Sequence, residues 1–314
     1  MIISASRRTD IPSYYSEWFY RRMEEGYVLV RNPMNIHQVS KISLSPEVVD
    51  GIVFWTKNPA GMLGGLSRLK EYTYYFQFTL TPYGNDIEAH LPSKRRIVIP
   101  AFKELSDTIG PERVIWRYDP ILINGQYTRE KHIGYFEMLA RILEGYTHRC
   151  VISFLDIYRN TAKHAGSLGL KAVTGEDMLA VGEAFSQIAS SCNIMLDTCA
   201  EIIELEPFGI GHSSCIDGKL LERLGGYHLR TVKDKNQRGE CGCVQSVDIG
   251  AYNTCNNGCR YCYANYNEAA VKKNMEAHNL LSPLISGHIL NEDRITDRKA
   301  VSLKESQITM EFPD

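Results

Sequence analysis

The sequence lacks any long hydrophobic run. No stretch reaches the roughly 18 apolar residues that a membrane-spanning helix needs. The opening, MIISASRRTD, has no basic region followed by a long apolar segment, so we expect no signal peptide. These absences predict a cytoplasmic protein without a membrane partner.

An excess of either charge is also missing. The 35 Lys and Arg nearly balance the 37 Asp and Glu, which leaves a net charge of −2. So small a charge creates no general field that attracts nucleic acid or an anionic membrane. A general DNA-binding protein is therefore disfavoured, while a local basic groove keeps nucleic acid open as a partner.

Three common catalytic patterns are absent. No Gly-x-Gly-x-x-Gly follows the first apolar run, no phosphate-binding P-loop is present, and no Gly-x-Ser-x-Gly elbow occurs. Dinucleotide-dependent redox chemistry, nucleotide hydrolysis and serine-type hydrolysis therefore have no support.

Cysteine, in contrast, is plentiful. The chain has nine cysteines, an odd number, and no expected export signal. Disulfides are rare in a reducing cytoplasm, so these cysteines indicate metal binding or catalysis.

Short apolar, β-branched or aromatic runs alternate with amphipathic stretches along the 314 residues. This alternation is typical of α/β proteins with a parallel sheet. Eight such runs predict a (β/α) TIM-type barrel, with a doubly wound open sheet as the alternative because periodicity does not show closure. The predicted strands are Ile2–Ser6, Tyr27–Arg31, Gly51–Thr56, Tyr74–Leu80, Arg113–Arg117, Cys150–Leu155, Asn193–Thr198 and Ser246–Gly250.

The predicted organisation is one domain with an insert. Residues 1–198 would form the first seven βα units, and residues 199–245 a cysteine-bearing insert too long for an ordinary βα loop. Residues 246–279 would hold the last strand, a cysteine loop and a helix. Residues 280–314 would form an extension packed on the barrel.

The strongest chemical signal is Cys255, Cys259 and Cys262, spaced C-x3-C-x2-C with Tyr261 before the last cysteine. Most four-iron clusters are held by four cysteines, so three would leave one iron open to a ligand. The alternative is structural zinc, which prefers four ligands and paired C-x2-C units. Spacing favours a [4Fe–4S] cluster.

Charged residues directly follow several predicted strands. In a parallel barrel the active site lies at these carboxyl ends, which predicts a polar pocket there. The alternative for each residue is an ion pair at the barrel rim. The candidates include Arg7, Arg8, Asp10, Lys57, Arg117 and Asp119.

A second group of cysteines precedes the loop. Cys199, Cys215, Cys241 and Cys243 have the ligand count of an auxiliary iron–sulfur cluster or a zinc site. Alternatively, some of them are small buried hydrophobic residues, as free cysteines commonly are.

The whole chain resembles a bacterial family described as a domain of unknown function. The segments that carry the resemblance are SASRRTDIP, FWTKNP, RYDP and CGCVQSVDIGAYNTCNNGCRYCYAN. Its cysteine loop resembles that of radical S-adenosylmethionine (SAM) enzymes. That resemblance implies a [4Fe–4S] cluster, SAM cleaved to a 5′-deoxyadenosyl radical acting on an unknown substrate, and an electron donor such as flavodoxin or ferredoxin.

The late position of the loop departs from most radical SAM enzymes, where it follows the first strand. If the barrel is circularly rotated, the strand before the loop lies beside Ile2–Ser6, and the three cysteines lie beside Arg7 and Arg8. The cofactor pocket would then include Ser4, Ser6, Arg7, Arg8, Asp10, Lys57, Arg117 and Asp119.

Two other functions stay open. One is a non-catalytic zinc or iron–sulfur protein with a structural or redox-sensing role. The other is DNA-lesion repair, because spore photoproduct lyase has a similar tyrosine-rich cysteine loop.

Overall fold

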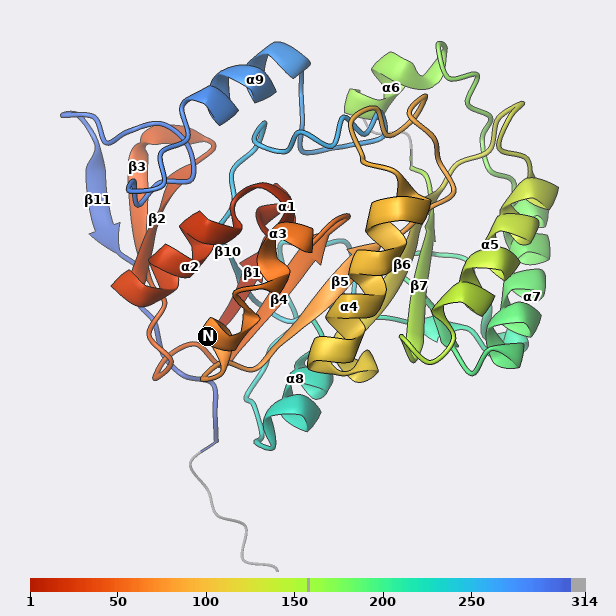
Figure 1. The fold of residues 1–314 in the computed structure, drawn as a ribbon, viewed down its shortest axis with the longest axis horizontal. Coiled ribbons are helices and arrows are strands. Elements are labelled where there is room, and N and C mark those ends of the chain that lie inside the picture. Colours follow the sequence, from red (N-terminus) through yellow and green to blue (C-terminus); the bar gives the residue numbers. More distant parts are fainter. Residues whose placement is uncertain (157–158, 306–314) are drawn as a thin grey trace, which may run out of the picture.

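The computed structural model describes residues 1–156 and 159–305, and its largest element is a parallel sheet (Figure 1). In this part of the chain eight strands follow the order β10-β1-β4-β5-β6-β7-β8-β9, and all neighbours run parallel. The predicted α/β class with a parallel sheet is thus confirmed. The strands are β1 (Ile2–Ala5), β4 (Gly51–Thr56), β5 (Tyr74–Thr79), β6 (Val114–Ile121), β7 (Arg149–Phe154), β8 (Met195–Thr198), β9 (Gly211–His212) and β10 (Val247–Asp248).

The closed ladder of a TIM-type barrel is not found. Within residues 1–156 and 159–305, the hydrogen-bonded order ends at β10 on one side and at β9 on the other. The sheet is therefore open at these two strands. The predicted neighbour of β1 is nevertheless correct, because Ile3 lies opposite Val247 and Ser4 opposite Asp248.

Tyr27–Arg31, predicted as the second strand of the barrel, lies in a different sheet. β2 (Tyr27–Asn32) pairs antiparallel with β3 (Asn35–Ser43), and β11 (Arg294–Asp297) pairs parallel with β3. The prediction was wrong because Pro33–Met34 is the whole link between β2 and β3, whereas a parallel crossover needs a dozen or more residues. The eighth strand of the main sheet is instead β9, which is too short to show a strand pattern in the sequence.

Helices alternate with the strands of the main sheet. Thr174 and Asp177 form a capping box at the start of α7, and Asp217 accepts a 3.0 Å hydrogen bond from the Leu220 N–H at the start of α8. The helices are α1 (Ile11–Tyr14), α2 (Ser16–Glu25), α3 (Ala60–Leu63), α4 (Ile99–Ile109), α5 (Arg129–Leu143), α6 (Arg159–Ala165), α7 (Gly175–Ser191), α8 (Gly218–Gly225) and α9 (Glu268–Glu276); shorter turns are η1 (Leu66–Leu69), η2 (Lys94–Val98), η3 (Pro111–Arg113) and η4 (Glu206–Phe208).

One face of the main sheet packs against the long helices. Phe78 contacts Phe102 of α4 with ring centres 4.7 Å apart, and Trp116 stacks on Phe136 of α5 at 4.9 Å. Figure 1 shows α2 and α4 in front of the strands and α5 and α7 beside β7. Truncating one of these buried rings to alanine typically costs about 3–5 kcal/mol, so this face contributes much of the stability.

The opposite face of the sheet is covered by the cysteine-bearing segment 199–245. Tyr75 and Ile115, which alternate with the residues of the first face, form a second core with Leu220 and Leu221 of α8. The segment therefore covers this face, called the inner face below, and its cysteines lie in that second core; the core under the long helices is called the outer core.

The described part of the C-terminal segment is bound to the rest of the protein. The Ser302 hydroxyl and the Leu303 N–H donate to the Asp50 carboxylate at 2.6 and 2.7 Å, and β11 extends the smaller sheet. The predicted extension 280–314 includes residues 306–314, which lie outside the described residues.

Among the helices of the described ranges, none has both the length and the apolar character needed to cross a membrane.

Candidate metal centre

The cysteine loop, Asp248–Asn265, lies at the carboxyl edge of the main sheet. Its centre forms an antiparallel bridge in which Cys259 lies opposite Glu88, and the Ala89 N–H donates to the Gly258 carbonyl at 3.3 Å. Gly258 has a φ of 65°, and a Cβ there would come 3.1 Å from Ala89 Cβ. Glycine at this position therefore allows both the left-handed backbone and the close approach.

Residues in and beside α1 anchor the loop at two further positions. The Asn257 amide donates to the Asp10 carboxylate at 3.0 Å, and the Tyr14 hydroxyl donates to the Asn257 amide oxygen at 2.9 Å. The Tyr15 hydroxyl donates to the Thr254 carbonyl at 2.5 Å. Asp10, a predicted pocket residue, thus helps to position the cysteine loop.

The three loop cysteines are partly exposed and lie close enough together that a negative charge on one raises the pKa of another. Burial of the sulfurs raises the pKa of Cys255, Cys259 and Cys262, that of Cys259 to about 12. The positive charge of Lys57 has the opposite effect and favours a lower pKa for Cys259 and Cys262. The thiols therefore keep their protons at neutral pH until a metal displaces them, and Lys57 favours the thiolate form that binds metal.

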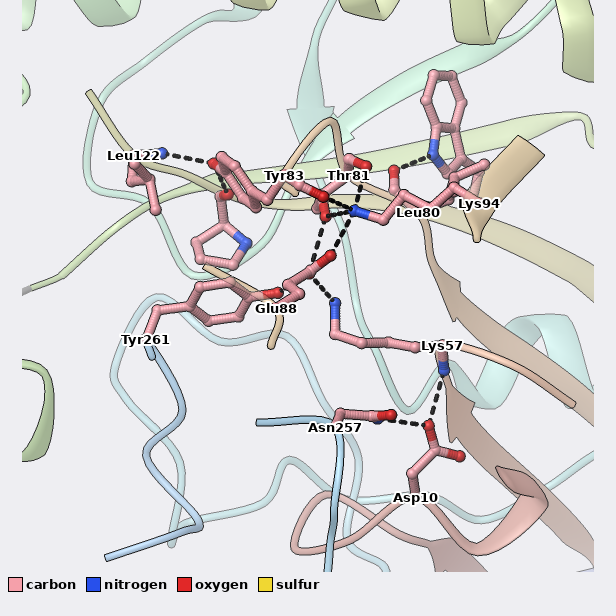
Figure 2. A network of polar contacts seen from close by, with 12 residues as sticks. Asp10, Lys57, Leu80, Thr81, Tyr83, Glu88, Lys94, Leu122, Asn257 and Tyr261 are labelled. Atoms are coloured by element: carbon pink, nitrogen blue, oxygen red, sulfur yellow. Dashed lines mark hydrogen bonds and ion pairs between the residues drawn. The ribbon is translucent and has the colours of Figure 1, made fainter. Parts of the chain in front are cut away.

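A buried carboxylate links the cysteine loop to its surroundings (Figure 2). Glu88 accepts a hydrogen bond from Lys57 Nζ at 2.7 Å and one from the Thr81 hydroxyl at 2.9 Å. It also accepts from Lys94 Nζ and from the hydroxyl of Tyr261, the residue before the third loop cysteine. Burial would raise the pKa of Glu88, but the two lysines outweigh it and lower that pKa to about 2.

The predicted pocket residues at the end of β1 lie beside the cysteine loop. The Ser4 and Ser6 hydroxyls each donate to the Asp248 carboxylate at 2.7 Å, and the Arg7 N–H donates to it at 2.8 Å. The Tyr263 hydroxyl, one residue after the third cysteine, donates to the Arg7 carbonyl at 2.6 Å. The cysteine loop therefore contacts the end of β1 at Arg7.

The side chains of Arg7 and Arg8 are partly exposed. Arg7 lies 3.7 Å from the Asp234 carboxylate, and Arg8 lies 3.9 Å from that of Asp248 with its guanidinium over the Tyr252 ring. These long ion pairs leave donors on both guanidinium groups available for an anion.

Arg117 and Asp119 lie together at the end of β6. Arg117 donates to the Asp119 carboxylate, which also accepts from the Ser153 hydroxyl, and Arg117 Nη1 lies 2.9 Å from Cys215 Sγ. The negative charge of Asp119 also helps to raise the pKa of Lys57. This pair therefore lies between the cysteine loop and the other cysteine group.

The structure also brings the four cysteines of the insert together. Cys199 Sγ lies 2.9 Å from Cys215 Sγ. The Cys215 side chain contacts Cys243, and Cys243 contacts Cys241.

In the described residues, no three His, Cys, Asp or Glu side chains are arranged to hold a metal ion as they stand. The three loop thiols are nevertheless a donor set that a four-iron cluster could use. A four-iron cluster distributes its thiolates over different irons, so it does not require the three sulfurs to converge on one ion.

Several residues around the loop were not predicted. Glu88, Asp248 and Asn257 make the contacts that hold it, yet each is an ordinary polar residue of an irregular segment or strand end. Asp248 lay in the middle of the predicted strand Ser246–Gly250, so it lacked the signal that Asp119 had as a residue following a strand. Glu88 lacked this signal as well.

Fold and site together define an α/β protein with a three-cysteine loop at the carboxyl edge of a parallel sheet. A family model described as "Domain of unknown function (DUF1848)" matches residues 2–264, and the chain belongs to this family. No curated protein and no solved structure matches the chain.

Proposed function

We propose that this protein is an iron–sulfur enzyme of the radical SAM type. Cys255, Cys259 and Cys262 would hold a [4Fe–4S] cluster and leave its fourth iron to SAM. When bound and reduced, such a cluster supplies the electron that cleaves SAM. The observation that carries the proposal is a three-cysteine loop packed on the end of β1, beside partly exposed arginines.

The charges around the loop suit an anionic cluster. The two positive charges of Lys57 and Lys94 exceed the single negative charge of Glu88. The charge of Lys57 also favours the thiolate form of Cys259 and Cys262. A nearby cation stabilises thiolates and any further negative charge that reduction adds. The network therefore supports both binding and reduction of a cluster.

The predicted pocket residues between positions 4 and 10 divide into two groups. Ser4, Ser6 and Asp10 are buried and use their side chains to hold the strand and the loop. Arg7 and Arg8 keep partly exposed guanidinium groups. Because guanidinium matches a carboxylate in a bidentate fork, these two arginines are our candidates for binding the SAM carboxylate.

The rotated strand order is part of this proposal. The strand before the loop, β10, pairs with β1, so the loop approaches the first strand from the end of the chain. Charged ends of β1, β4 and β6 then face the loop, which is the arrangement expected of a barrel-type active site.

The proposal is tested by reconstituting the protein with iron and sulfide without oxygen. We expect a reduced four-iron electron paramagnetic resonance signal that changes when SAM is added. The Arg8→Lys variant should keep the signal and bind SAM more weakly, because lysine cannot form the fork. A four-iron signal that does not change at saturating SAM would contradict the proposal.

A further inference from the structure

The four cysteines of the insert form a contiguous group on the inner face of the sheet. Cys215, Cys241 and Cys243 are buried, and Cys199 is partly exposed. They come from three places in the chain: directly after β8, shortly before α8, and shortly before β10. Thiols from separate segments that meet in one core form a donor set suited to a thiophilic metal.

The spacing of the sulfurs favours one ion over a cluster. Two thiolates on a tetrahedral ion lie roughly 3.8 Å apart, given metal–sulfur bonds of about 2.3 Å. Among the described residues no three such donors already surround one point, so the thiols must shift to take up an ion. Cys199 Sγ and Cys215 Sγ are 2.9 Å apart and must separate by about 1 Å to reach that spacing. Consecutive contacts link Cys215, Cys243 and Cys241, whereas a four-iron cluster would hold its thiolates further apart.

The surroundings provide donors and positive charge. Arg117 Nη1 lies 2.9 Å from Cys215 Sγ, and the Ile216 N–H donates to Cys243 Sγ at 3.3 Å. The Arg7 guanidinium is a second cation close to Cys241. A divalent ion with four thiolates is a net dianion, so these partners are the kind of outer shell that stabilises it.

We propose that Cys199, Cys215, Cys241 and Cys243 bind a single tetrahedral metal ion, Zn²⁺ or Fe²⁺, separate from the centre at the cysteine loop. This ion joins three parts of the insert and fixes them on the inner face of the sheet. The four ligands include none of the loop cysteines, so metal binding here does not require the radical SAM function, although Arg7 lies near both sites.

The test removes the loop centre first. In the triple variant Cys255→Ala, Cys259→Ala, Cys262→Ala, purified without oxygen, we expect about one zinc or iron per chain and no acid-labile sulfide. Adding Cys215→Ser should abolish this metal. Adding Cys192→Ser instead, at a buried thiol of the outer core, should leave it unchanged.

A spectroscopic probe covers the case in which Cys215→Ser does not fold. Co²⁺ added to the metal-stripped triple variant should give thiolate charge-transfer and tetrahedral absorption bands at about one equivalent. No stoichiometric metal, or a Cys199–Cys215 disulfide in its place, would overturn the proposal. Iron accompanied by sulfide would overturn the single-ion geometry.

Discussion

Glu88 joins three parts of the chain through one buried carboxylate. Its partners Lys57 and Lys94 lie 31 and 6 residues away in sequence, and Tyr261 lies 173 residues away. No local pattern predicts such a residue, because its importance arises from charges that only the fold brings together. Sequence reasoning identified Lys57 by its place after a strand and missed the anion it requires.

Replacing Glu88 should strongly destabilise the protein. In Glu88→Gln the buried Lys57 and the partly buried Lys94 lose their shared anion, which we expect to lower the free energy of unfolding by about 3–5 kcal/mol. Denaturant unfolding at pH 7 measures the change. The same substitution at the exposed Glu104 should alter stability by less than about 0.5 kcal/mol. Equal losses in the two variants would contradict a special role for Glu88.

His132 predicts a pH dependence near neutrality. Burial lowers its pKa to about 4, and its ring contacts the Tyr118 hydroxyl and the Leu122 carbonyl at 2.8 Å. Because the unfolded chain binds the proton near pH 6.5, the contribution of a neutral His132 is complete above pH 6.5 and is lost as the pH falls toward 4.

Between pH 7 and pH 5, this residue should remove about 2 kcal/mol of stability. Unfolding curves of the wild type and of His132→Phe at both pH values give the difference. A variant with the same pH slope as the wild type would show that His132 is not the cause.

At the scale of elements, alternation of strands and helices predicted most of the main sheet. The ranges of β1, β4, β5, β6, β7, β8 and β10 each overlap a predicted strand. The error at Tyr27–Arg31 arose because an apolar run does not show its partner, and the short Pro33–Met34 link was the available evidence for a hairpin. Closure also could not be predicted, since it depends on pairing between distant strands.

The cysteine loop should bind iron as a unit. Replacing Cys259 by serine removes one of three ligands, so we expect the four-iron content after anaerobic reconstitution to fall at least about tenfold. Cys192→Ser should leave the iron content unchanged, since Cys192 packs in the outer core. Iron and sulfide analysis measures both variants, and full retention of iron by Cys259→Ser would exclude this loop as the ligand set.

At the scale of the whole molecule, the sheet places two cysteine groups near one set of charged strand ends. The loop lies over the carboxyl edge, while the insert covers the inner face, and Arg117 and Asp119 lie between them. The sequence indicated both groups by ligand count and spacing. It did not indicate that the insert would fill the inner face, because that depends on Leu220 and Leu221 packing against Tyr75 and Ile115.

The most direct test of the radical SAM proposal is release of 5′-deoxyadenosine. Reconstituted protein is reduced without oxygen in the presence of SAM, and the product is measured by liquid chromatography with mass spectrometry. The account predicts 5′-deoxyadenosine from the wild type and none above background from the Cys255→Ala, Cys259→Ala, Cys262→Ala variant. A fully loaded and reduced wild-type cluster that binds SAM and releases no 5′-deoxyadenosine would contradict it.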